Sequence, residues 1–214
     1  MSIDKNSAAV DNDFINKVAQ IKTGTMSPEN ILGEIFAALQ IHGIMHPLVY
    51  EKELLKDRPG IKAIFDKNVV EYVSFDDIFQ GDEGKKAYYM FLVPELYNAL
   101  MGRRFPEDKD VFTFWIRQNS LGEIHSVSMC LVSECAIFLS DDGDSKALKN
   151  IVNQRAMGAI EVFNRNEIVK QYKKVVQKLL NVRTARHLRI RNDPLEGKVV
   201  NHEYAQLRSV INSH

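Results

Sequence analysis

The sequence predicts an α/β fold in which helices flank a central parallel sheet. Helix and strand patterns alternate through the second half of the chain, which is typical of strand-helix-strand units joined by right-handed crossovers. Residues 136–139 form a continuous apolar run, as expected of a central parallel strand that is covered on both faces. The length of 214 residues favours one domain with an appendage over two full domains.

The first part of the chain contains two predicted strands and two predicted helices. A short strand is predicted at residues 7–10, and a helix at residues 14–21. Ser27 and Pro28 supply an N-cap and a proline at the first helical position, and apolar residues then recur at helical spacing until Gly43. A second strand is predicted at residues 44–49.

Residues 57–117 give weaker signals. Short helical pieces are punctuated there by Pro59, Gly60, Gly81, Pro94 and Pro106. The clearest pieces are residues 84–92 and 94–101. We predict a helical insertion in this region and assign it no chemistry.

The pattern becomes sharper after this region. Residues 120–131 predict an amphipathic helix, and residues 136–139 and 159–163 predict two strands. Asp144 and Ser145 can cap a helix between these strands. From Ile168 onward, apolar residues keep a helical period while lysines occupy the other faces, which predicts a helix with one apolar side and one basic side.

The net charge of zero hides an uneven distribution of charge. Residues 169–191 contain eight cationic side chains and no carboxylate. They are Lys170, Lys173, Lys174, Lys178, Arg183, Arg186, Arg189 and Arg191. Such a run indicates either the solvated face of a helix or a surface that binds the phosphates of a nucleic acid.

Cysteine content and hydropathy predict a soluble, cytoplasmic protein. Cys130 and Cys135 are too few for a disulfide framework and lack the spacing of a zinc site, so we expect free thiols. The first twenty residues contain several charged side chains and therefore no apolar signal core. No stretch reaches the roughly 18 apolar residues of a membrane span, so no membrane partner is expected.

Acidic side chains follow three of the apolar runs. In an open parallel sheet, functional groups collect beyond the carboxyl ends of the strands, so these acidic residues are candidates for a functional site. They are Asp11 and Asp13 after the first strand, Glu51 and Glu53 after the second, and Asp141, Asp142 and Asp144 after residues 136–140. Glu123 comes from a fourth place, the first turn of the helix predicted at residues 120–131.

Carboxylates that converge in this way would repel one another. At a separation of about 4 Å, two of them repel by roughly 1 kcal/mol in a water-like dielectric and about 4 kcal/mol at an effective dielectric of 20. Several such pairs would raise carboxyl pKa values or require a bound cation. Because the candidate ligands are all oxygens, Mg²⁺ or Mn²⁺ is the expected ion.

The order of these motifs resembles the PIN-domain ribonuclease family. Residues 122–126, 138–144 and 159–162 look like the second half of a PIN domain, which carries an acidic residue that opens a helix, a strand that ends in Ser/Thr-x-Asp, and a closing helix-strand pair. Residues 10–13 are similar to the opening Asp-x-Asn/Ser/Asp motif. Residues 47–54 are similar to the motif in which Glu-Leu follows a strand, with Glu53 at the glutamate position and Glu51 as its substitute.

The resemblance covers about residues 9–172 and is strongest from Leu121 onward. It implies a PIN-like three-layer domain over residues 1–172, with the helical insertion near residues 57–117, and a basic C-terminal helical extension over residues 173–214. The insertion is longer than a compact PIN domain needs, and the extension has no counterpart in the family pattern.

The activity implied by the resemblance is metal-dependent hydrolysis of phosphodiester bonds, usually of single-stranded RNA. RNA is then the expected partner, and family analogy adds an antitoxin-like inhibitor protein and a homodimer.

The resemblance also assigns roles to the acidic residues. The catalytic group consists of Asp11, Glu53, Glu123 and Asp142. Asp11, Glu123, Asp142 and Asp144 would hold Mg²⁺ or Mn²⁺, and Glu53 would bind the metal or orient the attacking water. Asp13, Glu51, Ser140 and Asp141 would substitute for these residues or orient them.

Structural interpretations of the same residues stay open. Ser120 and Glu123 fit a capping box, and Asp11 and Asp142 can cap the helices that follow them. Asp141 fits a turn, and the two glutamates at positions 51 and 53 fit a solvated start of a helix. His46 and His125 fit a backbone partner or a surface position better than a catalytic base.

Two other functions are compatible with the sequence. Residues 10–13 also look like the nucleophile motif of haloacid-dehalogenase-like phosphatases, with Asp141 and Asp142 as the late acidic pair, but no convincing Ser/Thr and Lys motifs lie between them. The other alternative is a non-catalytic PIN-like adaptor that uses its basic tail to bind RNA or a protein.

Overall fold

The computed structural model describes residues 3–20, 26–116 and 120–189. These residues fold around a five-stranded, all-parallel sheet with the strand order β3-β2-β1-β4-β5. The strands are β1 (Ser7–Val10), β2 (His42–Met45), β3 (Val70–Tyr72), β4 (Ile137–Leu139) and β5 (Glu161–Phe163). The predicted α/β class with a central parallel sheet is confirmed.

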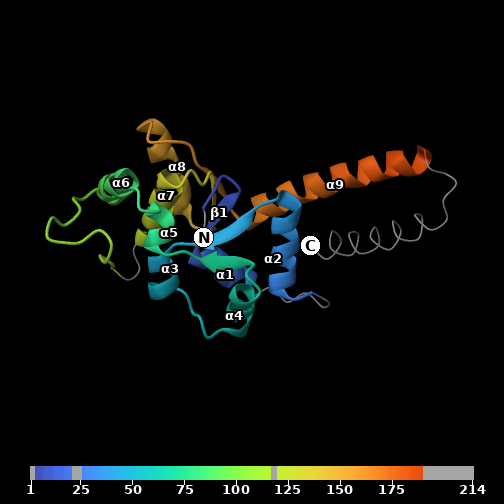
Figure 1. The fold of residues 1–214 in the computed structure, drawn as a ribbon, viewed down its shortest axis with the longest axis horizontal. Helices are drawn as coiled ribbons and strands as arrows, with labels where there is room; N and C mark the ends of the chain where they lie inside the picture. Colours follow the sequence, from blue (N-terminus) through green and yellow to red (C-terminus); the bar gives the residue numbers. More distant parts are fainter. Residues whose placement is uncertain (1–2, 21–25, 117–119, 190–214) are drawn as a thin grey trace.

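Helices cover both faces of the sheet (Figure 1). They are α1 (Asn12–Val18), α2 (Pro28–Leu39), α3 (Pro47–Lys52), α4 (Pro59–Asp66), α5 (Phe75–Phe79), α6 (Glu83–Met101), α7 (Leu121–Val132), α8 (Gly143–Gln154) and α9 (Arg165–Arg189). Because successive strand residues point to opposite faces, Ala9 and Phe138 pack in the core on the side of α5 to α8. Val10 and Leu139 pack in the core with α1, α2, α4 and α9.

The strand order places a topological switch point between β1 and β4. The chain builds β1, β2 and β3 in one direction across the sheet and then returns to place β4 on the other side of β1. The backbone amide of Asp11 donates to the Leu139 carbonyl across this junction at 2.9 Å. In open α/β sheets, the crevice beyond the carboxyl ends of such strands is the usual place for a functional site.

Two predicted boundaries differ from the structure because of proline. The predicted strand at residues 44–49 ends early, since Pro47 starts α3 with His46 as its N-cap. The predicted pieces at residues 84–92 and 94–101 form one helix, α6, with Pro94 inside it.

Residues 57–117 also supply an element that the sequence analysis did not predict. β3 forms one edge of the sheet, next to β2. It has three residues, of which only Val70 is fully buried, so it lacks the longer alternation that identifies a strand in a sequence.

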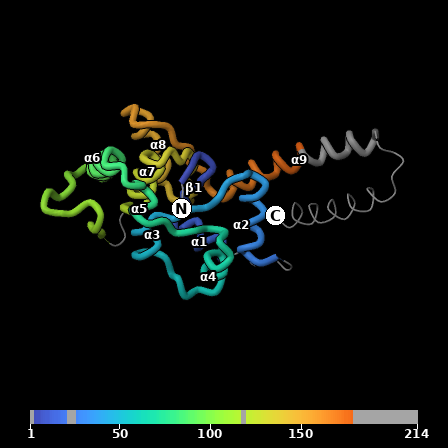
Figure 2. Tube along the Cα trace, in the orientation of Figure 1, coloured from blue at the N-terminus to red at the C-terminus, as the bar shows by residue number. Residues whose placement is uncertain are grey.

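Helix α9 packs beside α2 and then extends beyond it (Figure 2). Its buried residues include Ile168, Tyr172 and Val176, whereas Lys174 and Lys178 are exposed. The helix is therefore amphipathic, as predicted, and it runs without a break through the proposed domain boundary at residues 172–173.

Two further predictions concern cysteine and membranes. Cys130 and Cys135 are buried free thiols. Within the described part of the chain, no helix combines the length and hydrophobicity that a membrane span requires.

Candidate functional site

Asp11 lies at the switch point, directly after β1. Its side chain caps α1, because Oδ2 accepts a hydrogen bond from the Asp13 amide at 3.3 Å. The same oxygen also accepts a hydrogen bond from the Ser140 hydroxyl at 3.4 Å. The residue is only 1% exposed, and its Oδ1 has no hydrogen-bond partner among the described residues. A buried oxygen without a partner is rare and calls for a ligand or another explanation.

Ser140 joins Asp11 to Asp142 at the end of β4. Its hydroxyl donates to Asp11 and accepts from the Asp142 amide at 3.1 Å and from the Ser145 hydroxyl at 2.7 Å. Asp142 in turn caps α8 by accepting from the Asp144 amide at 2.9 Å. Both aspartates therefore cap helices, as one interpretation of the sequence predicted, and the same two residues belong to the candidate site.

Glu53 and Glu123 approach the same place from α3 and α7. Glu123 lies in the first turn of α7 and is almost fully buried. Glu53 is the C-cap residue of α3, and its carboxylate lies against Gly122, where an added Cβ would be only 2.8 Å from Oε1. A glycine at position 122 is therefore what admits the Glu53 carboxylate next to Glu123.

The pKa values of three carboxyl groups at this place are raised. Burial raises the pKa of Asp11 to about 6. The charge of Asp13 adds a smaller increase, and the hydrogen bonds that the Asp11 carboxylate accepts oppose the increase. Burial also raises the pKa of Glu53 to about 7, and the charges of Asp11 and Asp142 add to it. For Glu123, burial and then Asp11, Glu53 and Asp142 raise the pKa to about 9. Glu53 and Glu123 therefore lie within the electric field of Asp11 and Asp142.

These carboxyl groups form a candidate cation site, but their side chains are not yet positioned as ligands around one ion. Within the described residues, no group of three or more His, Cys, Asp or Glu side chains already has an arrangement that could hold a metal ion. The free Oδ1 of Asp11 and a donor set made only of oxygens nevertheless fit a hard divalent ion. Ion binding would require the glutamate side chains to move and Glu123 to lose its proton.

Other acidic residues named by the sequence have partners of their own. Asp141 forms an ion pair with Arg165 and lies 3.8 Å from the Lys17 ammonium. Asp13 also pairs with Lys17. Both carboxylates are therefore partly neutralised by these cations.

Asp144 and Glu51 occupy different positions around the site. Asp144 accepts a hydrogen bond from Ser120, the residue before α7. Ser120 makes no side-chain cap to α7, so the capping box proposed for Ser120 and Glu123 is absent. Glu51 is exposed and lines a separate hollow between α3 and the end of β3.

A buried polar chain connects the two glutamate-bearing helices. The Tyr89 hydroxyl lies 2.8 Å from His46 Nε2 and 2.7 Å from His125 Nδ1. His46 Nδ1 accepts from the Leu48 amide, so the proton of the neutral His46 ring is on Nε2 and points at Tyr89. Tyr89 must then donate to His125, and the direction of the whole chain is fixed.

Both histidines are therefore internal hydrogen-bonding groups and not surface residues. Burial lowers the pKa of His46 well below its usual range, and it lowers the pKa of His125 to about 3 against the opposing effect of the Phe114 carbonyl.

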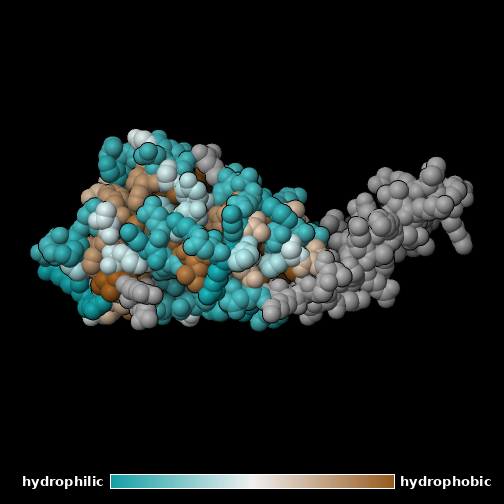
Figure 3. Space-filling model, turned by 90° about the horizontal axis from the view of Figure 1, so that it is seen from below, coloured by the Kyte–Doolittle hydropathy of each residue, from teal (hydrophilic) through white to brown (hydrophobic). Residues whose placement is uncertain are grey.

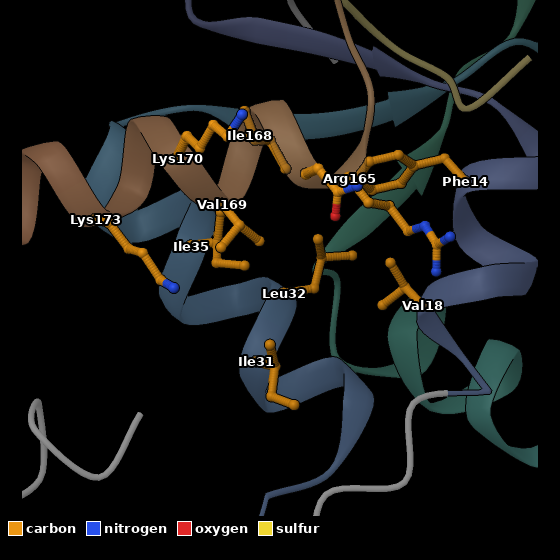
Figure 4. A pocket seen from close by; sticks show the side chains of 11 residues that line it. Phe14, Val18, Ile31, Leu32, Ile35, Arg165, Ile168, Val169, Lys170 and Lys173 are labelled. Carbon is orange, nitrogen blue, oxygen red and sulfur yellow. The ribbon is translucent and has the colours of Figure 1, made fainter. Parts of the chain in front are cut away.

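Lysines of α9 border a hollow of about 460 Å³ on the opposite face of the sheet from α7 (Figure 4). Val18, Leu32 and Val169 line the hollow, and the side chains of Lys173 and Arg165 lie at its two ends. Lys170 also lines this hollow. It does not contain the carboxylates, so it is a surface separate from the candidate cation site.

The remaining basic residues are only partly described. Lys174 and Lys178 are exposed on α9. Arg183, Arg186 and Arg189 belong to the same helix, but their side chains lie outside the described residues, as does the whole of Arg191. Figure 3 shows one face of the molecule, on which hydrophilic side chains separate several small apolar patches.

Comparisons with protein-family models, curated proteins and solved structures gave no match for this chain. The resemblance to PIN-domain ribonucleases therefore stays a prediction.

Several contributors to the site were not predicted. Gly122 and Ser120 contact acidic residues, Ser145 donates a hydrogen bond to Ser140, and Tyr89 bridges the two histidines. The sequence offers a signal for Gly122 alone, since it directly precedes an acidic residue in the first turn of a helix.

Proposed function

We propose that this chain is a metal-dependent endoribonuclease with a PIN-like architecture that cleaves single-stranded RNA. One observation carries the proposal. Carboxyl groups from four separate segments, at positions 11, 53, 123 and 142, converge, because Asp11 and Asp142 raise the pKa of both Glu53 and Glu123, and a buried Asp11 oxygen beside them has no hydrogen-bond partner among the described residues. Their location at the switch point of a parallel sheet and the order of the acidic motifs support it.

Asp11, Glu123 and Asp142 are the residues that would hold Mg²⁺ or Mn²⁺, with Asp144 beside them. When bound, such an ion offsets phosphate charge and makes a bound water more acidic. Ser140 fixes the relative position of Asp11 and Asp142 through its hydrogen bonds.

Glu53 is suited to proton transfer. Its pKa of about 7 means that it is partly ionised near neutral pH, which is favourable for a general base. In this proposal, a Glu53 carboxylate oxygen orients the attacking water and accepts its proton. The exposed lysines of α9, within the basic C-terminal extension, bind phosphates farther along the RNA. An antitoxin-like inhibitor and a homodimer are further expectations from the resemblance, and a cytoplasmic location is expected from the cysteine content and hydropathy.

A cleavage assay tests this function. Purified protein is incubated with single-stranded RNA and Mn²⁺ or Mg²⁺, with and without EDTA. The Asp142→Asn variant should lower the rate by about 100-fold or more, the effect typical of losing one preorganised electrostatic group. The exposed Asp57→Asn variant is the matched control and should keep the wild-type rate. Cleavage that persists in both EDTA and Asp142→Asn would show a contaminating nuclease and count against the proposal.

A non-catalytic adaptor is the second candidate. It is favoured by the lack of a preformed three-ligand group among the described residues. Calorimetry that detects no Mn²⁺ binding, together with RNA binding that is lost when Lys170, Lys173, Lys174 and Lys178 are changed to alanine, would select this function over the ribonuclease.

A further inference from the structure

An exposed pair of stacked rings lies at the same edge of the sheet as the carboxylates. Tyr72, the last residue of β3, is 58% exposed. Its ring stacks on Tyr50 of α3 with a centroid distance of 4.4 Å and an interplanar angle of 13°. Because Tyr50 also contacts the Phe65 ring at 5.2 Å, it gives Tyr72 a rigid support.

Cations and a hollow border this ring pair. The Lys56 ammonium lies 4.0 Å from the centroid of the Tyr50 ring. Tyr50 and Tyr72 line a hollow of about 360 Å³ together with Lys52, Glu51 and Thr113, a size within the usual range of small-ligand sites. The hollow thus combines an aromatic surface, a nearby positive charge and polar groups that can hydrogen-bond to a planar ligand.

The ring pair is close to the candidate cation site along both the helix and the sheet. Tyr50 precedes Glu53 by three residues, so the two side chains lie on neighbouring positions of one helical side. In the sheet, β3 is two strands from β1, roughly 10 Å at the usual strand spacing. A nucleic acid with a phosphate beside Asp11 can therefore place a neighbouring base at Tyr72.

We propose that Tyr72, supported by Tyr50, stacks on a base of single-stranded RNA one or two nucleotides from the bond that is cleaved. This inference rests on the proposed function for its substrate class. An aromatic face accepts any base, and only unpaired bases are free to stack on it. The ring pair therefore gives the site a preference for single strands, and the Lys56 cation favours the adjacent RNA backbone.

Binding measurements test the ring pair directly. The probe is a fluorescently labelled 12-nucleotide single-stranded RNA, measured by anisotropy with Asp142→Asn in every variant to prevent cleavage. Loss of one base-aromatic stack costs about 1–3 kcal/mol, so Tyr72→Ala should weaken binding about 5- to 150-fold. Tyr72→Phe retains the aromatic face and should bind within about twofold of the parent.

The controls use a second ring and a second substrate. Phe91 on α6 is similarly exposed, at 53%, and is also stacked, on Tyr88. It does not line the hollow beside Tyr72, so Phe91→Ala should leave RNA affinity unchanged. The affinity for the same sequence in a duplex should not change in Tyr72→Ala, because paired bases are already stacked. An equal loss for duplex and single strand, or an equal loss in Phe91→Ala, would overturn the inference.

The two proposals fail in different ways. If the wild-type protein cleaves RNA but Tyr72→Ala binds the single strand as the parent does, the stacking site is wrong and the ribonuclease stands. If no metal supports cleavage but Tyr72→Ala loses binding, the stacking site stands and the ribonuclease is wrong.

Discussion

At the scale of single residues, Gly122 controls how closely Glu53 approaches the other carboxylates. A methyl group at this position would meet the end of a flexible side chain and not the backbone, so the Glu53 carboxylate can move away at little cost to the fold. Gly122→Ala should therefore leave the melting temperature nearly unchanged and weaken Mn²⁺ binding by about tenfold, the lower end of the effects seen for groups that support metal ligands.

Calorimetric titration with Mn²⁺ measures this change. Gly143 provides a matched control, since it also lies in the first turn of a helix and an added Cβ would meet nothing within 4 Å. Equal Mn²⁺ affinities of Gly122→Ala and Gly143→Ala would contradict the place given to Glu53.

The raised pKa of Glu123 predicts that the stability of the protein depends on pH. The folded-state pKa values of Asp11, Glu53 and Glu123, at about 6, 7 and 9, are above their ordinary values. Above about pH 6.5, where the buried His46 and His125 are neutral in the folded chain and largely neutral in the unfolded chain, Glu53 and Glu123 make the folded chain bind more protons than the unfolded chain. Its free energy of unfolding accordingly falls as pH rises through the pKa of Glu53 and then that of Glu123.

Thermal melts in EDTA between pH 5 and pH 9 check this dependence. Glu123→Gln removes the largest contribution and should raise the melting temperature at pH 9 by several degrees, since 1 kcal/mol corresponds to roughly 2–4 °C at this chain length. Glu134→Gln, at an exposed glutamate, is the control. A wild-type protein that gains stability from pH 6 to pH 9 would exclude the raised pKa values.

At the scale of elements, the His46, Tyr89 and His125 chain joins the start of α3 to α7. Tyr89→Phe would leave His46 Nε2 and His125 Nδ1 without partners in an apolar core. We expect a loss of about 1–3 kcal/mol in the free energy of unfolding. A weaker Mn²⁺ affinity should accompany it, because α3 and α7 carry the two glutamates.

Urea denaturation and Mn²⁺ titration measure the two effects. Tyr97→Phe is the matched control, since Tyr97 is also buried and packs in the same core against Phe105 and Phe114. If both variants lose the same stability, the tyrosine-histidine chain contributes nothing specific.

The elements also differ in how far the sequence predicts them. β1, α2, α7 and β4 follow from apolar runs and caps within one segment, and so do the positions of Asp11 and Asp142 after strands. The end of β2 was wrong because Pro47 starts a helix inside an apolar run. The contacts of Tyr89, Gly122 and Arg165 join residues far apart in the chain, and no local pattern in a single sequence encodes such contacts.

At the scale of the whole molecule, the lysines of α9 lie apart from the candidate cation site. If the exposed Lys174 and Lys178 bind phosphates, each neutralised phosphate contributes about 0.7 to the slope of log affinity against log salt for a single strand. The double alanine variant should lower this slope by about 1.4. Lys5 and Lys62, exposed elsewhere, give the control variant, and equal slopes for the two would leave α9 as a solvated helix.

The two outer strands of the sheet have a consequence for self-association. β3 and β5 contain only three residues each. Each edge of the sheet therefore offers few unpaired amide and carbonyl groups to an extended segment of another molecule. Copies of this protein are thereby discouraged from joining strand to strand into fibrils. If the expected homodimer forms, its two-fold axis should relate helical surfaces and leave each sheet separate.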